Sequence, residues 1–237
     1  IEDTIDWLTR NNINYVGAGM DIYQAKKPAI LEHRGTTVGY VNYNCVGPKE
    51  SWAAHDKAGC SYLNVITHYE LEHPTPGGPP SIYTWVSMDS LLEMKEAISK
   101  LKEDCDIVVA AFHKGIGHTP VKLAEYEHEA SYAAIDAGAD LVVGHHAHIL
   151  KGIEFYNGKP IFHGLGNFIT YLKVSTLRAG KHPEKWAEKR KELFGFEPDP
   201  EYPTYPFHPE AIYTLISKCV IREKQIREVC CVPLIVN

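Results

Sequence analysis

IVVAAFHKG, residues 107–115, and LVVGHHAH, residues 141–148, are the two stretches that decide the fold. In each, an apolar run typical of a buried strand ends directly in histidine. The residues between them have the pattern of a helix at about 121–137, and Gly138 suits the left-handed position after a helix end. A strand–helix–strand unit is right-handed and sets its strands parallel. We therefore expect both histidine groups at one edge of the sheet, where open α/β sheets bind ligands.

The rest of the chain supplies further strands and helices around this unit. Amphipathic helices are predicted at 2–12 and over about 16 residues from 87 or 89 onward. A short strand is predicted at 14–19, and a long loop is predicted around 74–80, where Pro and Gly are frequent. Residues 180–209 are expected to form an irregular excursion. Hairpins are predicted at 28–32 with 38–44, 153–156 with 160–162, and 213–221 with 226–234.

Composition excludes several classes of function. The 237 residues carry a formal net charge of −6 and no dense Lys/Arg window, so a nucleic-acid partner is not expected. No apolar run approaches the roughly 18 residues of a transmembrane helix. The six cysteines form no CxxC pair, which slightly favours a reducing, cytoplasmic compartment for a soluble protein. No signal peptide is visible, although a targeting or anchor segment could have been removed upstream.

The histidines suggest a metal site. His146 and His148 are two residues apart, so in an extended segment they share a face, and His113 can meet them from the neighbouring strand. His145 is expected to point the other way, outside the ligand set or against substrate. Isolated surface histidines are the alternative, but four at two strand ends favour metal ligation. No Asp ends a strand, since Asp140 begins its own, so the carboxylate part of the site is missing.

At this point the sequence resembles a known family. Residues 134–148, followed by 152–162 and by Leu165-Gly166-Asn167-Phe168, closely resemble the CapA-like (poly-γ-glutamate capsule biosynthesis) family of the calcineurin-like metallophosphoesterase superfamily. Residues 15–19, 28–31 and 232–233 are also similar to it, so the resemblance covers nearly all of the chain.

The resemblance implies an α/β fold, a four-layer α-β-β-α sandwich with the site at the strand ends. Residues 1–237 would then be the C-terminal two-thirds of one domain whose N-terminal part is missing from this chain. The family's metal set includes an early Asp, a Glu or Asp and an Asn-His pair, all upstream of the segment that matches Ile1. Only His113, His146 and His148 match it here, so the upstream segment is an expected partner. Two divalent ions are implied, and mixed N/O ligands admit Mn, Fe, Zn or Mg.

Three further residues are candidates on the substrate side. The family commonly has Trp after the first histidine, whereas here Lys114 could contact an anionic substrate or be solvated. His118 could reach substrate or be an exposed loop residue. By resemblance Asn167 lies near the metal side, and its alternative is a plain turn residue.

The resulting hypothesis is a metal-dependent hydrolase acting on an anionic or peptide-like small molecule or polymer. His145 and His118 would orient substrate or shuttle protons, and Lys114 and Asn167 would bind substrate. The alternative is a non-catalytic capsule-assembly protein that binds an anionic polymer. A mononuclear zinc protein with three histidine ligands is a third possibility.

Overall fold

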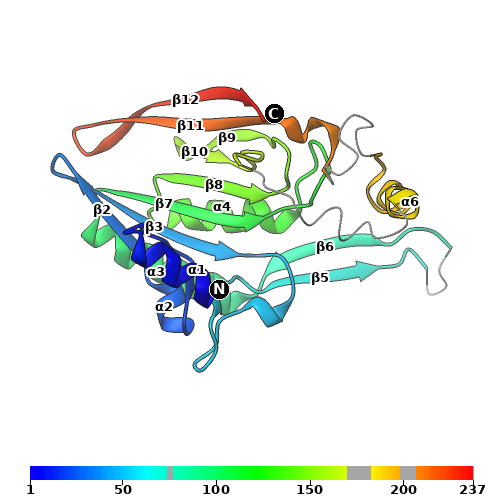
Figure 1. Cartoon of the computed structure of the whole chain (residues 1–237), viewed down its shortest axis with the longest axis horizontal. Helices are drawn as coiled ribbons and strands as arrows, with labels where there is room; N and C mark the ends of the chain where they lie inside the picture. Colours follow the sequence, from blue (N-terminus) through cyan, green and yellow to red (C-terminus); the bar gives the residue numbers. More distant parts are fainter. Residues whose placement is uncertain (74–76, 170–182, 198–206, 237) are drawn as a thin grey trace.

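A six-stranded mixed sheet forms the centre of the computed structural model, which describes residues 1–73, 77–169, 183–197 and 207–236 (Figure 1). The middle strands β3, β7, β8 and β10 run parallel, and the edge strands β2 and β9 are antiparallel to their neighbours. The protein is therefore a mixed α/β structure. In order across the sheet the strands are β2 (Ala29–His33), β3 (Thr36–Asn44), β7 (Ile107–Lys114), β8 (Leu141–His146), β10 (Lys159–Phe162) and β9 (Ile153–Tyr156).

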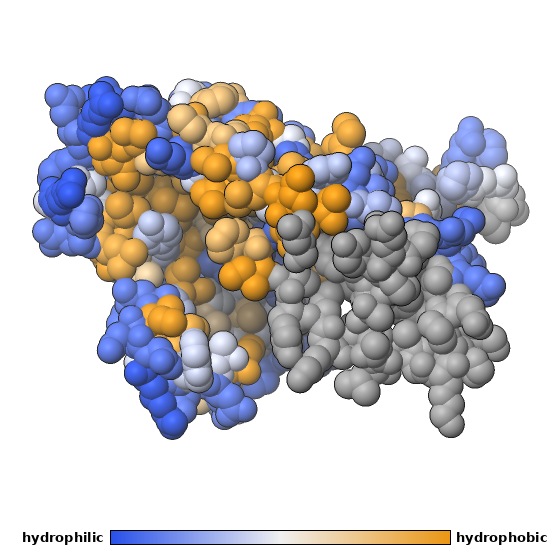
Figure 2. Space-filling model, turned by 45° about the horizontal axis from the view of Figure 1, so that its top comes forward, coloured by the Kyte–Doolittle hydropathy of each residue, from blue (hydrophilic) through white to orange (hydrophobic). Residues whose placement is uncertain are grey.

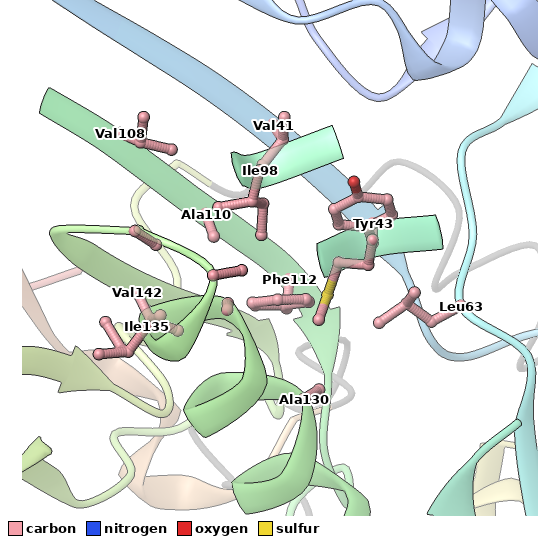
Figure 3. Close-up of a cluster of buried hydrophobic side chains, with 14 of the residues drawn as sticks. Val41, Tyr43, Leu63, Ile98, Val108, Ala110, Phe112, Ala130, Ile135 and Val142 are labelled. Atoms are coloured by element: carbon pink, nitrogen blue, oxygen red, sulfur yellow. The ribbon is translucent and has the colours of Figure 1, made fainter. Parts of the chain in front are cut away.

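Two helices cover one face of this sheet. They are α3 (Met88–Asp104) and α4 (Glu125–Asp136), and the largest hydrophobic core lies between them and the sheet. Figure 3 shows Ile98 of α3 and Ile135 of α4 in one apolar cluster with Phe112 of β7. Every second residue of β7 points to this face, as the pleat of a strand requires.

The other face is covered by a long hairpin of β11 (Tyr213–Arg222) and β12 (Gln225–Ile235). Ile107 and Val109 of β7 pack there against Leu215 and Val229 of the hairpin. Figure 2 shows that apolar side chains are also exposed on the surface of the molecule on this side of the sheet. The described residues thus form three layers: helices, sheet and hairpin. The four-layer sandwich stays a prediction.

The remaining elements lie around the sheet. These are α1 (Glu2–Arg10), β1 (Ala18–Gly19), α2 (Ile22–Lys26), the short helices η1 (Lys49–Ser51) and η2 (Pro209–Ile212), β4 (Gly59–Cys60), the hairpin of β5 (Val65–Glu70) and β6 (Ser81–Val86), and α6 (Pro183–Phe194). The β5–β6 hairpin extends away from the central sheet (Figure 1).

Most predicted elements are confirmed, with three differences. The β5–β6 hairpin was not predicted, and of the predicted loop only residues 77–80 are described. The strand predicted at 14–19 shrinks to Ala18–Gly19. Part of the predicted excursion at 180–209 is the helix α6, whereas residues 180–182 and 198–206 lie outside the described residues.

Candidate functional site

Four histidines meet at the carboxyl ends of two neighbouring parallel strands. His113 pairs in register with His145, and Lys114 pairs with His146, at the ends of β7 and β8. A cavity of about 680 Å³ opens at this edge, on the side that β11 covers. Its lining consists of His113, His145, His146, His148, Leu165, Gly166, Asn167, Phe168, Ile169, Thr214, Leu215, Ile216 and Ser217.

His145 does not point away from the predicted ligands. Its Nδ1 lies 2.9 Å from the Nδ1 of His113, and the two ring centroids are 4.8 Å apart. The prediction of an opposite orientation was wrong, because residues paired in register on adjacent strands present their side chains to the same face. The two rings share one hydrogen bond, so one Nδ1 donates and the other accepts.

His146 reaches the same cavity through an unusual backbone. Its φ is +107°, which ends the regular alternation of β8 and brings its ring centroid to 4.6 Å from that of His113. His148 also has a positive φ, +60°. Non-glycine residues in such conformations each cost roughly 1–3 kcal/mol and cluster at functional sites. The chain segment 146–148 therefore stores strain at the pocket.

Asn167 holds His148 in place. Its Oδ1 lies 2.8 Å from the Nδ1 of His148, and the ring of His148 stacks on Phe207 with a centroid distance of 4.2 Å. Since the amide oxygen can only accept, Nδ1 of His148 is the donor, and in the neutral ring Nε2 then keeps a lone pair. Asn167 thus contacts a predicted metal ligand directly, as well as lining the cavity.

His118 lies behind His148 and does not line the cavity. Its backbone N–H donates to the carbonyl oxygen of Ala147, its φ is +56°, and its ring lies nearly parallel to that of His148 at 5.5 Å. The side chain is buried, so the alternative of an exposed loop histidine does not apply. A role for His118 in proton transfer stays a prediction.

Lys114 is turned away from the cavity. It follows His113 on the strand, so its side chain enters the opposite face of the sheet, where it is completely buried against α4. Its Nζ donates to the carbonyl oxygen of Glu127 and to Oγ of Ser131, and lies 3.1 Å from Nδ1 of His163. Both suggestions for Lys114, substrate contact and a solvated side chain, are therefore wrong.

Three of the cavity histidines, His113, His145 and His146, have a lowered pKa. Burial, followed by the neighbouring imidazoles His145, His146 and His148, lowers the pKa of His113 to about 4. Burial and the same kind of neighbours lower the pKa of His146 to about 4, and the pKa of His145 is lowered as well. Metal ligation requires neutral imidazole, so the electrostatics of the site fit a metal.

The predicted ligands share the cavity but do not converge on one point. Among residues 1–73, 77–169, 183–197 and 207–236, the group of three ligand atoms within 4.8 Å of one another is His128, Glu154 and His163, which sequence reasoning missed. No carboxylate of the described residues lines the cavity, as expected from the absence of Asp at the strand ends. The part of the cavity lining that comes from β11 was also not predicted, because nothing in the sequence of β11 links it to the distant histidines.

Comparison with known proteins places the chain among capsule synthesis proteins. The family model described as "Bacterial capsule synthesis protein PGA_cap" matches residues 1–172. The PGA biosynthesis protein CapA of Bacillus subtilis is 30% identical over 170 residues, which are 71% of this chain and 38% of that protein. The capsule biosynthesis protein CapA of Bacillus anthracis is 26% identical over 168 residues, 71% of this chain and 35% of that protein.

A third relative carries a different description. A "probable polyglutamine synthesis accessory protein" of Mycobacterium tuberculosis is 28% identical over 173 residues, 71% of this chain and 40% of that protein. The chain thus spans about two fifths of the length of the curated relatives it matches.

The likeness to solved structures is weaker. A crystal structure of a hypothetical protein from Thermus thermophilus has a TM-score of 0.42 and 16% identity, covering 88% of this chain and 61% of that one. Among the described helices, none combines the length and apolar character needed to cross a bilayer.

Proposed function

The chain belongs to the bacterial capsule synthesis protein PGA_cap family, and we propose that it is a metal-dependent hydrolase acting on an anionic or peptide-like capsule polymer. The names of its relatives point to PGA, which we interpret as poly-γ-glutamate, so γ-glutamyl bonds are the proposed substrate class. Because the chain spans only part of its relatives, the proposal concerns the full-length protein.

One observation supports this proposal above the others. The Nδ1 atoms of His113 and His148 are both engaged, by His145 and by Asn167, at 2.9 and 2.8 Å. Ligating histidines are usually oriented in this way, with one ring nitrogen held by a partner and the other left for the metal. His148 therefore keeps Nε2 available at the cavity, and His113 does so when its Nδ1 is the donor to His145.

In the proposed site His113, His146 and His148 are metal ligands. The remaining ligands would be the carboxylates and the Asn-His pair of a segment upstream of this chain, for two divalent ions of Mn, Fe, Zn or Mg. Bound divalent ions polarise a scissile bond and lower the pKa of a bridging water. His145, which contacts His113, would exchange a proton with substrate, and His118 would act through the ring of His148.

Metal analysis and a hydrolysis screen of the full-length protein test this function. We expect bound divalent metal, and turnover of γ-glutamyl peptides or phosphodiesters that a chelator abolishes. His146→Ala should lose turnover and the metal bound at the cavity, whereas His68→Ala, which changes an exposed histidine of β5, should keep both. Wild-type protein without metal, or a fully active His146→Ala variant, would contradict the proposal.

A second candidate function is non-catalytic binding of the polymer during capsule assembly. It is favoured by the accessory description of one relative and by the lack of convergence of the three predicted ligands. Polymer binding that persists in His146→Ala, without turnover in the wild-type protein, would identify this function.

A further inference from the structure

A second group of potential ligands lies on the opposite face of the sheet. His128 comes from α4, Glu154 from β9, and His163 follows β10 directly. The Nε2 of His163 lies 2.8 Å from Oε1 of Glu154, and the Nδ1 of His128 lies 3.3 Å from the same oxygen. The three donors come from three separate elements and share one point, and none of them lines the cavity of His113.

The hydrogen bonds of the described residues leave one atom of this group unsatisfied. The Nδ1 of His128 is shielded from solvent and has no hydrogen-bond partner among the residues the structure describes, since its approach to Glu154 lacks hydrogen-bond geometry. Buried polar atoms nearly always have a partner, and an exception points to an ion or a water at that place. The unsatisfied nitrogen lies 3.3 Å from the one carboxylate of the group.

The other two donors are held in place by neighbouring side chains. The hydroxyl of Tyr132 donates to Oε2 of Glu154 at 3.2 Å, which leaves Oε1 facing the two histidines. The ring of His163 is buried, and its Nδ1 lies 3.1 Å from Nζ of Lys114. Such outer contacts, which fix the orientation of a ligand, are a regular feature of metal sites. They also give the buried Lys114 a positioning role.

We propose that His128, Glu154 and His163 form a second metal site, for a zinc-like divalent ion with a water in the fourth position. Two imidazoles and one carboxylate are a ligand set that zinc takes, with metal–ligand distances that put neighbouring donors roughly 3.3–3.6 Å apart in a tetrahedron. The observed separations of 2.8 and 3.3 Å, with all donors within 4.8 Å, need only small shifts.

The ion would connect α4 to the β9–β10 hairpin. When it binds, it takes the place of the proton on Nε2 of His163, and that proton leaves to solvent. The ring remains a neutral imidazole because its Nδ1 takes a proton from Nζ of Lys114, 3.1 Å away, which becomes a neutral amine. Since the site connects elements of the fold, its occupation should raise the thermal stability of the protein by mass action.

Titration of chelator-treated, full-length protein with Zn²⁺ alone tests the proposal. Wild-type protein should bind one more Zn²⁺ ion per chain than Glu154→Gln or His128→Gln. Zn²⁺ should also raise the Tm of the wild-type protein by more than it raises the Tm of either variant. Both residues are partly exposed, and Gln can still accept from His163, so these variants should fold. His68→Gln, which changes an exposed histidine far from the group in sequence, is the matched control and should behave as wild type.

The outcome is separable from that of the proposed hydrolase site. His146→Ala should keep the Zn²⁺ ion that Glu154→Gln loses. If the hydrolase proposal fails, this difference between the two variants should still be observed. Identical stoichiometry and identical Tm response in wild type, Glu154→Gln and His128→Gln would overturn the second site, and would mean that the gap beside His128 holds water.

Discussion

The Nδ1 atoms of His113 and His145 lie 2.9 Å apart, at register-paired positions on β7 and β8. The contact needs one Nδ1 with a proton and one without, because protonation of both rings would set two N–H groups against each other. The pKa of each ring is lowered, first by burial and then by neighbouring histidines. The contact is therefore incompatible with a positive charge on both rings at once.

The first prediction concerns the pH dependence of stability. The pKa of His113 and of His146 is about 4 in the folded protein, below the ordinary 6.5, so the unfolded chain binds more protons between these values. Their contribution to the free energy of unfolding is complete above about pH 6.5 and is lost as the pH falls toward 4. Urea unfolding of chelator-treated protein between pH 4 and 7.5 measures it.

A substitution at His113 separates the effect of this histidine on stability from the effects of the other titrating groups. His113→Asn should weaken the loss of stability between pH 6.5 and 4, while His68→Gln should leave the wild-type curve unchanged. Parallel curves for wild type and His113→Asn across this range would show that the pKa of His113 is not lowered by folding.

The second prediction concerns Asn167, whose Oδ1 accepts from Nδ1 of His148 at 2.8 Å. Asn167→Ala removes the group that keeps Nε2 of His148 as the free nitrogen. Loss of such a contact typically lowers metal affinity about 10- to 100-fold. Metal competition with a chromophoric chelator measures the change, and the exposed Asn11→Ala is the control. If Asn167→Ala binds metal as tightly as the wild-type protein, then His148 is not a metal ligand whose orientation depends on Asn167.

The strand ends that build the cavity could be predicted from sequence because their signals are local. The residues of β7 are apolar almost throughout, as expected of a strand buried on both faces, and Asn157-Gly158 marks the β9–β10 turn. The position of Lys114 follows from the same alternation, since a residue next to His113 on a strand must face the other way.

Other parts of the site depend on distant or strained residues. The positive φ of His146 brings its ring to the cavity, and no pattern marks a non-glycine residue for that conformation. Ile216 of β11 reaches the cavity although a long stretch of chain separates it from the histidines. Likewise His128, Glu154 and His163 belong to three elements, so their proximity is a property of the fold rather than of any short sequence.

The third prediction concerns Gly144, where β8 passes close to the chain that follows β10. A Cβ at this position would lie 2.3 Å from the carbonyl oxygen of His163, and backbone atoms cannot move aside as a side chain can. Gly144→Ala should therefore lower the free energy of unfolding by about 1–3 kcal/mol or more. It should also disturb the adjacent His145.

A matched glycine provides the control for this variant. Gly152 is exposed and has open space around its Cβ position, so Gly152→Ala should stay within about 0.5 kcal/mol of wild type. Denaturant unfolding of both variants measures the difference. Equal stability of the two would mean that β8 and β10 are not as close at Gly144 as described.

The fourth prediction concerns Asp140, which lies at the edge of the sheet opposite the histidines and joins three elements there. Its Oδ2 accepts from Nζ of Lys102 at 2.7 Å and from the backbone N–H of Val108 at 3.0 Å, and its Oδ1 accepts from Nζ of Lys159 at 2.6 Å. Burial raises the pKa of this carboxyl, but the hydrogen bonds from the two lysines outweigh burial and hold the pKa below its usual value. Its stabilising effect is therefore present above about pH 4 and is lost in more acidic solution.

Asp140→Asn should remove this effect, because the amide sets an N–H group against a lysine or against Val108. Hydrogen bonds to charged groups contribute about 1.5–3 kcal/mol each, and the partial exposure of both lysines reduces this contribution. We therefore expect Asp140→Asn to lower the free energy of unfolding at pH 7 by about 2 kcal/mol. Metal binding at the opposite edge should be unaffected, which separates this residue from the ligands. The exposed Asp136→Asn is the control, and a stability loss as small as that of the control would show that Lys102 and Lys159 do not depend on Asp140.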